Sequence, residues 1–441
     1  MITVEAANVR KTLSNHILTD GFEPVVDLEL SHGSWLVDGR DGREYLDLFT
    51  MFASIPIGYN HPKLLEHKDD LAIAAMNKPT NSDIYTAQLA QFVESFFTIT
   101  MPDIFKYGFF IEGGALAIEN ALKASFDWKV RKNFQKNGSA HEMGSKVIHF
   151  KDCFHGRTGY TISLTNTSDP RKTVHFPKFD WPRIVNPAVK FPLNDDNLAE
   201  VMALEAKALD QIKGTIGEHG NDLAALIIEP IQGEGGDHHF RTEFFQGLRQ
   251  ICDENEIMLV YDEVQSGMGI TGKWWAWQNH NVAPDLMAFG KKSQVCGFVS
   301  TSRLDEVENH VFKESSRINS TWGGNLTDMV RLTIYLSIIK EENLIDAAGK
   351  TGEYLHNQLL TLQDDYADLV SNARGAGLMC AFDLPNSETR DKLLDQIIQN
   401  GTLILGSGDN AIRFRPPLNI STDEIDYGID IIRKSLDAII N

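Results

Sequence analysis

The chain has 441 residues, of which 42% are hydrophobic and 23% charged, and its formal net charge is −20. This length predicts about two or three domains, and the composition is that of an ordinary soluble globular protein. The negative charge argues against nucleic acid and anionic membranes as partners. The four cysteines form no C-x-x-C pair and no apolar run approaches membrane-spanning length, so we expect a cytoplasmic protein without a disulfide framework, zinc site or targeting segment.

Three regions follow one another along the chain. Residues 1–60 are predicted to form an N-terminal segment with short antiparallel strands at 35–37 and 45–49, which we expect to pack with the C-terminal small domain. Over 61–325, apolar runs alternate with helical patterns, which predicts a large α/β domain with a mostly parallel central sheet. Its candidate strands are residues 107–111, 146–150, 224–228, 258–261 and 286–289.

The region 326–441 is predicted to be a small α+β domain. A helical pattern covers 326–342, and strand candidates lie at 378–383, 402–405 and 411–414. The most loop-like insertion of the whole chain is predicted at 132–144.

The stretch 257–292 places a carboxylate and an amine at two strand ends. Asp262 directly follows the apolar run 257–261, and Lys291 follows the run 286–289 and Gly290. Ligands of open α/β sheets bind outside the carboxyl ends of the strands, so both groups are candidates for a site. A lysine pair such as Lys291 and Lys292 is ordinarily a solvated surface feature. Here the apolar strand leaves little solvent, and a desolvated lysine loses its proton and becomes nucleophilic.

Further candidate groups lie at other strand ends. Gly114 and Ala115 belong to a glycine turn that opens a helix, where free N–H groups and the helix dipole suit a phosphate, although such turns are more often structural. Phe154 could stack on a flat ring and Arg157 could grip a carboxylate, although an isolated aromatic is more often a core residue. The acid Glu234 follows the apolar run 224–228 and could equally cap a loop.

Six short segments in order resemble one family over nearly the whole chain. They are EGGA at 112–115, FHG at 154–156, EPIQGE at 229–234, DEVQ at 262–265, PD at 284–285 with GK at 290–291, and IRFRPP at 412–417. Together they look like the class III (ω-amino) aminotransferases, which are fold-type I enzymes with pyridoxal 5′-phosphate as cofactor.

Three other segments narrow the resemblance. AFGKKSQVCG at 288–297, RINSTWGGNL at 317–326 and GLMCAF at 377–382 look most like the members that act on L-lysine. The resemblance implies transfer of the ε-amino group of L-lysine to 2-oxoglutarate, giving glutamate and 2-aminoadipate 6-semialdehyde, which would cyclise. Alternatives are another ω-amine donor, namely ornithine or 4-aminobutyrate, a decarboxylase or aminomutase of the same fold, and a non-enzymatic binding role.

The resemblance also implies roles for residues around the cofactor. Lys291 would carry the cofactor covalently, with Lys292 as the alternative. Asp262 would pair with the pyridine nitrogen, Gln265 would hydrogen-bond the phenolic oxygen of the ring, and Phe154 would stack on its face.

Phosphate and carboxylate contacts complete the implied site. Gly114 and Ala115 would bind the phosphate from one subunit and Thr321 from the other, which makes a homodimer with shared active sites the smallest active unit. Arg157 would bind the distal carboxylate of both substrates, and Arg413 the carboxylate beside the reacting carbon of the keto acid. Glu234 would pair with Arg413 when the amine donor is bound, because a buried charge without a partner is unfavourable.

Overall fold

A seven-stranded sheet forms the centre of the computed structural model, which describes residues 2–138 and 141–440. Strands β4 to β8 run parallel, and β9 is antiparallel to its neighbours β8 and β3. In spatial order the strands are β3 (Phe105–Ile111), β9 (Cys296–Thr301), β8 (Leu286–Phe289), β7 (Met258–Asp262), β6 (Leu223–Ile228), β4 (Lys146–Phe150) and β5 (Arg183–Ile184). The predicted mostly parallel α/β sheet is therefore confirmed.

The central strands are buried on both faces, as their unalternated apolar sequences predict. Successive side chains of a strand point to opposite faces, and here they enter two separate hydrophobic cores. Leu226 and Leu259 belong to one core, while their neighbours Ala225 and Val260 belong to the other. Helices must therefore cover both faces of the sheet.

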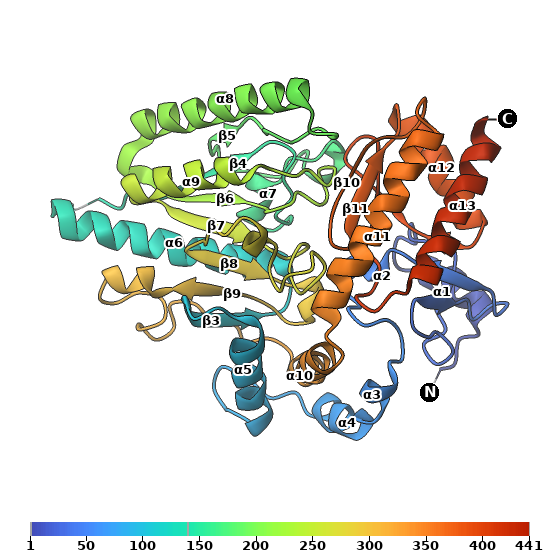
Figure 1. Ribbon diagram of the computed structural model, residues 1–441. Coiled ribbons are helices and arrows are strands. Elements are labelled where there is room, and N and C mark those ends of the chain that lie inside the picture. The colour runs from blue at the N-terminus through green and yellow to red at the C-terminus, as the bar shows by residue number, and fades with distance from the viewer. Residues whose placement is uncertain (1, 139–140, 441) are drawn as a thin grey trace.

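Helices lie on both sides of the sheet, whereas the first two helices of this region lie apart from it (Figure 1). In chain order the helices of the region are α3 (Pro62–Leu65), α4 (Lys68–Met76), α5 (Ala87–Thr100), α6 (Gly114–Asn137), α7 (Thr161–Leu164), α8 (Asp195–His219) and α9 (Thr242–Glu254). Side-chain caps define several of their starts: Thr86 accepts a hydrogen bond from the Leu89 N–H at α5, and Asn194 accepts one from the Asn197 N–H at α8. Short 3₁₀ helices are η1 (Ala6–Asn8), η2 (Pro170–Lys172), η3 (Gly220–Asp222), η4 (Ala276–Asn279), η5 (Lys291–Ser293) and η6 (Ser302–Glu306).

The two ends of the chain come together beside the central sheet, where Figure 1 shows the first strands next to the last helices. The N-terminal elements are α1 (Val9–Ser14), β1 (Trp35–Val37), β2 (Glu44–Asp47) and the short turn α2 (Thr50–Ala53). The C-terminal elements are α10 (Leu326–Glu341), α11 (Leu344–Asp365), β10 (Ser371–Ala376), β11 (Met379–Asp383), α12 (Ser387–Gln399), β12 (Thr402–Leu403), β13 (Leu405–Ser407), β14 (Ala411–Phe414) and α13 (Thr422–Ile440). Strand β12 pairs with β2, which joins the two ends in one three-stranded sheet.

Three local predictions differ from the structure. The single strand expected at 402–405 is divided between two sheets, because β12 pairs with β2 whereas β13 pairs with β14. Strands β5, β9 and β10 were not expected. The predicted loop at 132–144 is wrong up to Asn137, because α6 continues to that residue, and residues 139–140 lie outside the described part of the chain. The division into regions 1–60, 61–325 and 326–441 stays a prediction.

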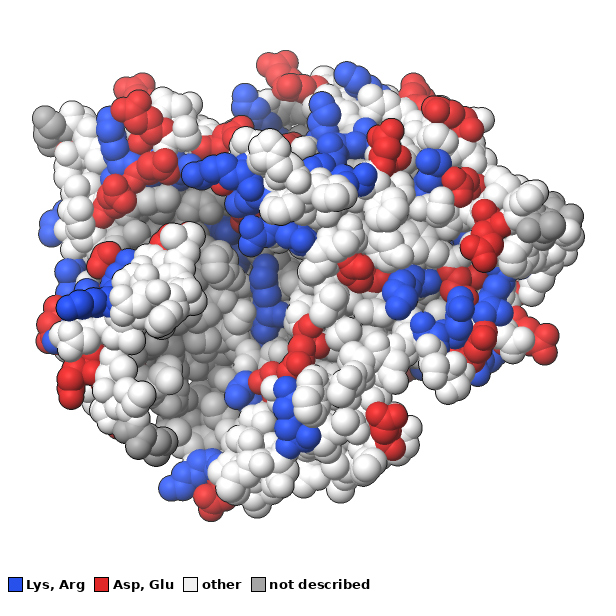
Figure 2. Space-filling model, turned by 180° about the vertical axis from the view of Figure 1, so that it is seen from behind, with Lys and Arg blue, Asp and Glu red and all other residues white. Residues whose placement is uncertain are grey.

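Charged side chains of both signs are spread over the surface (Figure 2). The face shown there is hollowed, and Lys and Arg side chains gather around the hollow although the net charge of the chain is −20. Within the described residues, no helix combines the length and apolar character that a membrane span requires.

Candidate active site

A cavity of about 530 Å³ lies at the carboxyl ends of the parallel strands. This is the edge where ligands of such sheets bind, because the loops after the parallel strands meet there. Seven residues singled out in the sequence line it: Gly114, Ala115, Phe154, Arg157, Asp262, Gln265 and Lys291. Segments from β3 to β8 thus converge on one space.

The two adjacent lysines occupy different environments. Lys291 lines the cavity, and its backbone has a φ of 54° in the left-handed region. Burial lowers the pKa of Lys291 to about 8, and the positive charge of Arg413 acts in the same direction. Lys292 is only 2% exposed and does not line the cavity, and its amine has no hydrogen-bond partner among the described residues. Of the two amines, that of Lys291 is the one that a ligand in the cavity can reach.

Asp262 ends β7 and is held from two sides. Its Oδ2 atom lies 2.8 Å from His155 Nδ1, and its Oδ1 atom accepts a hydrogen bond of 3.0 Å from the Val264 N–H. Burial opposes charge on His155, but the Cys153 sulfur and the hydrogen bond with Asp262 outweigh it and raise the pKa of His155 well above its usual value. The Asp262 carboxylate is therefore fixed in orientation at the cavity wall.

The start of α6 offers free donors to the cavity. The residue before the helix is Gly113, with a φ of 102°, and within the described part of the chain no side chain caps the first N–H groups. The turn is tightly packed, because a Cβ atom on Gly114 would lie 2.9 Å from Val264 Cγ1. Such a turn lets the backbone approach an anion closely, at the positive end of a long helix.

Glu229 lies behind the predicted ring-stacking residue. One carboxylate oxygen accepts a hydrogen bond of 2.8 Å from the Phe154 N–H, and the other accepts one of 3.1 Å from the Gly233 N–H. Burial raises the pKa of Glu229 to about 7, while the positive charge of His155 opposes this rise. Glu229 lines the cavity and was given no role from sequence alone.

Gln265 connects the cavity to two arginines. Its Oε1 atom accepts a hydrogen bond of 3.3 Å from Arg413 and bonds of 2.8 and 3.0 Å from Arg415. Since arginine only donates, the amide oxygen of Gln265 must face these side chains, which leaves its NH₂ group as a donor for a ligand.

Arg413 is 3% exposed and does not line the cavity itself. Its NH2 atom lies 3.1 Å from Glu234 Oε2, so the two residues form an ion pair beside Gln265. A second cation contacts the same carboxylate: Lys172 Nζ lies 2.5 Å from Glu234 Oε1. No sequence pattern pointed to Lys172.

Arg157 and Thr321 differ from the residues above in their surroundings. Arg157 lines the cavity, is exposed, and makes no ion pair or hydrogen bond with the described residues. It is available to an anionic ligand. Thr321 is exposed and does not line the cavity of its own chain, so an intrachain contact of Thr321 with a ligand there is not expected.

Five other lining residues were given no role from the sequence, although three of them lie in segments that carried the family resemblance. They are Ser54, Val264, Gln294, Cys296 and Asp328. Ser54 follows the turn α2, in which all four residues have positive φ values between 41° and 66°. A left-handed conformation costs about 1–2 kcal/mol per residue other than glycine, and such strain persists mainly near functional sites. The turn packs against η5, which contains Lys291.

The cavity suits pyridoxal phosphate, the cofactor implied by the sequence. The molecule needs an amine for its aldehyde, an acid for its ring nitrogen, an aromatic face and an anion site. Lys291, Asp262 and Phe154 provide the first three around one cavity, and the uncapped start of α6 provides the fourth. The residues present therefore fit the cofactor.

Comparisons with known proteins agree with this chemistry. The family Aminotransferase class-III matches residues 20–436. The L-lysine-epsilon aminotransferase of Mycobacterium tuberculosis strain H37Rv is 48% identical over 434 residues, which are 98% of this chain and 96% of that protein. That of Amycolatopsis lactamdurans is 46% identical over 436 residues, again 98% and 96%.

A solved structure also resembles this chain over nearly its whole length. The lysine aminotransferase from M. tuberculosis in the internal aldimine form has a TM-score of 0.96 and 48% identity, and the match covers 99% of this chain and 100% of that chain. Family match, sequence identity and fold agree over nearly the full length. The chain therefore belongs to the class III aminotransferases, which are pyridoxal-phosphate enzymes.

Proposed function

We propose that this aminotransferase moves the ε-amino group of L-lysine to 2-oxoglutarate, giving glutamate and 2-aminoadipate 6-semialdehyde. The observation that carries the proposal is the ion pair of Glu234 with Arg413, together with an Arg157 that has no partner among the described residues. The names of the similar proteins, L-lysine-epsilon aminotransferases with 46% and 48% identity, support the same donor.

The two arginines match the two substrates. Lysine brings its only carboxylate far from the reacting amine, whereas 2-oxoglutarate has one carboxylate beside the reacting carbon and another at the far end. Arg157 binds the far carboxylate of either substrate. Arg413 binds the near carboxylate of 2-oxoglutarate, and Glu234 pairs with Arg413 when lysine is bound, so that no buried charge stays unpaired.

Four residues hold the cofactor and govern proton transfer. When bound, pyridoxal phosphate supplies an aldehyde for the amine and a ring that accepts the electrons of the deprotonated carbon. Asp262, oriented by His155, would keep the ring nitrogen protonated, and Phe154 would lie against the ring face. Lys291 carries the cofactor between turnovers, and because burial lowers its pKa to about 8, its freed amine takes a proton from the ε-carbon of the substrate.

The remaining contacts fix the cofactor within a homodimer. The Gln265 NH₂ group donates to the phenolic oxygen, and the N–H groups of Gly114 and Ala115 bind the phosphate. Thr321 of the partner subunit completes the phosphate site. This arrangement agrees with the exposed position of Thr321 outside its own cavity.

Exposed apolar side chains support the dimer. Tyr85 and Ile84 are 77% and 67% exposed, Trp322 lies next to Thr321, and Leu116 lies next to Ala115 at the phosphate end of α6. Exposed large apolar side chains of this kind are typical of surfaces that contact another subunit. Sedimentation of the holoenzyme is expected to give a dimer or a multiple of it.

An amino-donor panel tests the proposed substrate. The holoenzyme is mixed with lysine, ornithine or 4-aminobutyrate without keto acid, and conversion of the bound cofactor to its amine form is followed by absorbance. We expect lysine to react about tenfold faster than the other two, since small differences in chain length are worth roughly 1–3 kcal/mol. Addition of 2-oxoglutarate then restores the original spectrum.

Other outcomes would replace the proposal. Faster conversion by ornithine or 4-aminobutyrate would change the donor and leave the class of reaction intact. Release of carbon dioxide, or turnover that needs no keto acid, would indicate a decarboxylase or an aminomutase instead.

A further inference from the structure

Glu234 is held by two cations, one at each carboxylate oxygen. Arg413 NH2 lies 3.1 Å from Oε2, and Lys172 Nζ lies 2.5 Å from Oε1. The side chains of Glu234 and Lys172 are 22% and 30% exposed, whereas that of Arg413 is 3% exposed. The two positive charges together hold the pKa of the Glu234 carboxyl below its usual value, although burial alone would raise it.

The two cations are mounted on different parts of the chain. Arg413 lies on β14 in the C-terminal sheet, while Lys172 ends the short helix η2. Asp169 caps η2 by accepting a hydrogen bond from the Arg171 N–H, so this turn is organised without help from Glu234. Either contact can therefore break while the other is kept.

The backbone of Glu234 is also fixed. Its carbonyl oxygen accepts a hydrogen bond of 2.9 Å from the Gly408 N–H. A change of partner by Glu234 is thus a rotation of its side chain rather than a movement of the loop, and a rotation that frees Arg413 can leave Oε1 on Lys172.

We propose that Lys172 is a positioning residue that retains Glu234 while Arg413 binds the keto acid. This inference rests on the proposed alternation of Glu234. A carboxylate that leaves Arg413 in this partly buried place is unfavourable unless another cation holds it. Lys172 lowers that cost mainly when Glu234 has left Arg413, which we call the open state. In the closed state, Glu234 stays paired with Arg413, so the carboxylate has a second cation in any case.

The two half-reactions should therefore respond differently to loss of Lys172. In Lys172→Met, Glu234 keeps Arg413 as its only cation, so the closed state is favoured. Binding of 2-oxoglutarate should weaken about tenfold, the scale of a partly exposed charge pair, and the lysine half-reaction should change less than about twofold.

Binding and kinetics measure this split in the holoenzyme. The dissociation constant of glutarate, an unreactive dicarboxylate with the same carboxylate spacing as 2-oxoglutarate, gives the binding effect without turnover. Single-turnover rates with lysine and with 2-oxoglutarate give the kinetic effect. Lys172→Arg should restore both, and Arg171→Met is the matched control, because Arg171 lies on the same turn with an 88% exposed side chain.

Two outcomes would overturn the inference. One is an equal effect of Lys172→Met on both half-reactions. The other is a full effect of Lys172→Met on glutarate in a Glu234→Ala background, since Lys172 would then bind the ligand directly. If Glu234→Ala alone fails to slow the lysine half-reaction, the alternation itself is wrong, so the two failures are distinguishable.

Discussion

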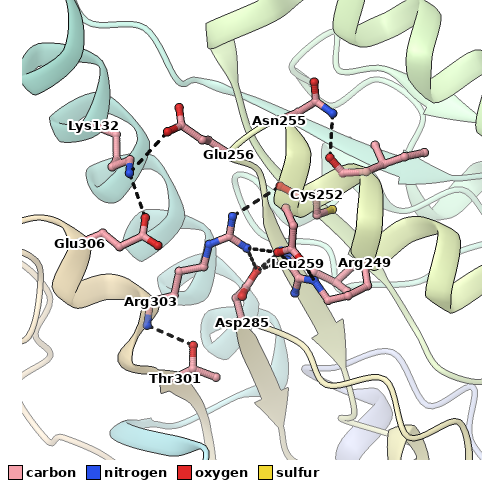
Figure 3. Close-up of polar contacts among 12 residues, drawn as sticks. Lys132, Arg249, Cys252, Asn255, Glu256, Leu259, Asp285, Thr301, Arg303 and Glu306 are labelled. Carbon is pink, nitrogen blue, oxygen red and sulfur yellow. Dashed lines mark hydrogen bonds and ion pairs between the residues drawn. The ribbon is translucent and has the colours of Figure 1, made fainter.

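Strands β7 and β8 carry charged clusters at both ends, and the two clusters differ in how completely they are paired. At the amino ends, Asp285 accepts hydrogen bonds of 2.8 Å from the Leu259 N–H and from Arg303, and Arg249 lies 3.1 Å away (Figure 3). Arg303 and Arg249 also pair with Asp253. Every charged group there has an oppositely charged partner.

The carboxyl ends show the opposite arrangement. Burial lowers the pKa of Lys291 to about 8 and raises that of Glu229 to about 7. The Lys292 amine and His155 Nε2 are buried and have no hydrogen-bond partner among the described residues. The pKa values of Lys291 and Glu229 thus lie close to neutrality, and both residues line the cavity.

The difference separates groups that stabilise from groups that react. An oppositely charged partner stabilises the charged form of a buried group, whereas burial without such a partner shifts the group toward its neutral form, and shifted groups of this kind cluster at functional sites. The same strands thus join a stabilising cluster at one end to a reactive cluster at the other. Substitutions at the carboxyl ends should therefore change mainly the catalytic rate, and substitutions at the amino ends mainly the free energy of unfolding.

The largest effect is expected at the reactive end. Lys291→Ala should lower transamination by about 10⁴-fold or more, because both covalent attachment and proton transfer are lost. Lys292→Ala should keep covalent attachment. Borohydride reduction of each holoenzyme, followed by peptide mapping, measures this. A label on Lys292 in the native protein would contradict the assignment.

At the stabilising end, Asp285→Ala should lower the free energy of unfolding by about 3–5 kcal/mol, because it leaves two arginines partly buried without their shared carboxylate. The turnover of the protein that remains folded should be unchanged. Chemical denaturation and kinetics measure the two quantities. Asp253→Ala is the matched control: its side chain is 57% exposed, so a loss of only about 0–1 kcal/mol is expected. Comparable losses in both variants would argue against a special role of Asp285.

Glu234→Ala should slow the lysine half-reaction about 10- to 100-fold more than the 2-oxoglutarate half-reaction. The reason is that Arg413 then has no carboxylate partner when lysine is bound. A buried charge without a partner destabilises that state by several kcal/mol. Single-turnover rates of the two half-reactions provide the test. Equal slowing of both would show that Glu234 serves structure alone.

At the reactive end, local sequence signals pointed to the strand ends, and the resemblance to the family supplied the roles. A buried strand that ends in polar residues made Asp262 and the pair Lys291 and Lys292 candidates, and the choice of Lys291 came from the resemblance. The alternation of strands and helices likewise predicted the central sheet. Strand β9 escaped prediction because CGFVST mixes small and polar residues, and its place between β8 and β3 is set by tertiary pairing.

Contacts between distant segments could not be predicted in this way. Lys172 reaches Glu234 across 62 positions of sequence, and Ser54 reaches the cavity from the N-terminal segment. Neither residue has a neighbouring pattern that distinguishes it from a surface residue. The same holds for residues 402–405, which were expected to form one strand. Their division between β12 and β13 depends on the strands with which they pair, and these come from other parts of the chain.

The smallest effect expected is a pH dependence that belongs to Lys291 alone. Its pKa is lowered to about 8 by burial, so about half of the amine is in the reactive neutral form at pH 8, and nearly all of it is neutral above about pH 9. Covalent attachment of pyridoxal phosphate to the apoenzyme should therefore be about tenfold slower at pH 7 than on the plateau above pH 9. Stopped-flow absorbance measures the rate.

Two comparisons decide whether that pH profile comes from Lys291. A lysine acetylated on its α-amino group keeps an ε-amine with a pKa of about 10.4 in free solution, so its reaction with the cofactor should still rise between pH 9 and 10. The apoenzyme Lys292→Met should keep the profile of the native protein. A native midpoint near 10 would mean that Lys291 is solvated like a surface lysine, and the contrast between the two ends of β7 and β8 would then lose its chemical basis.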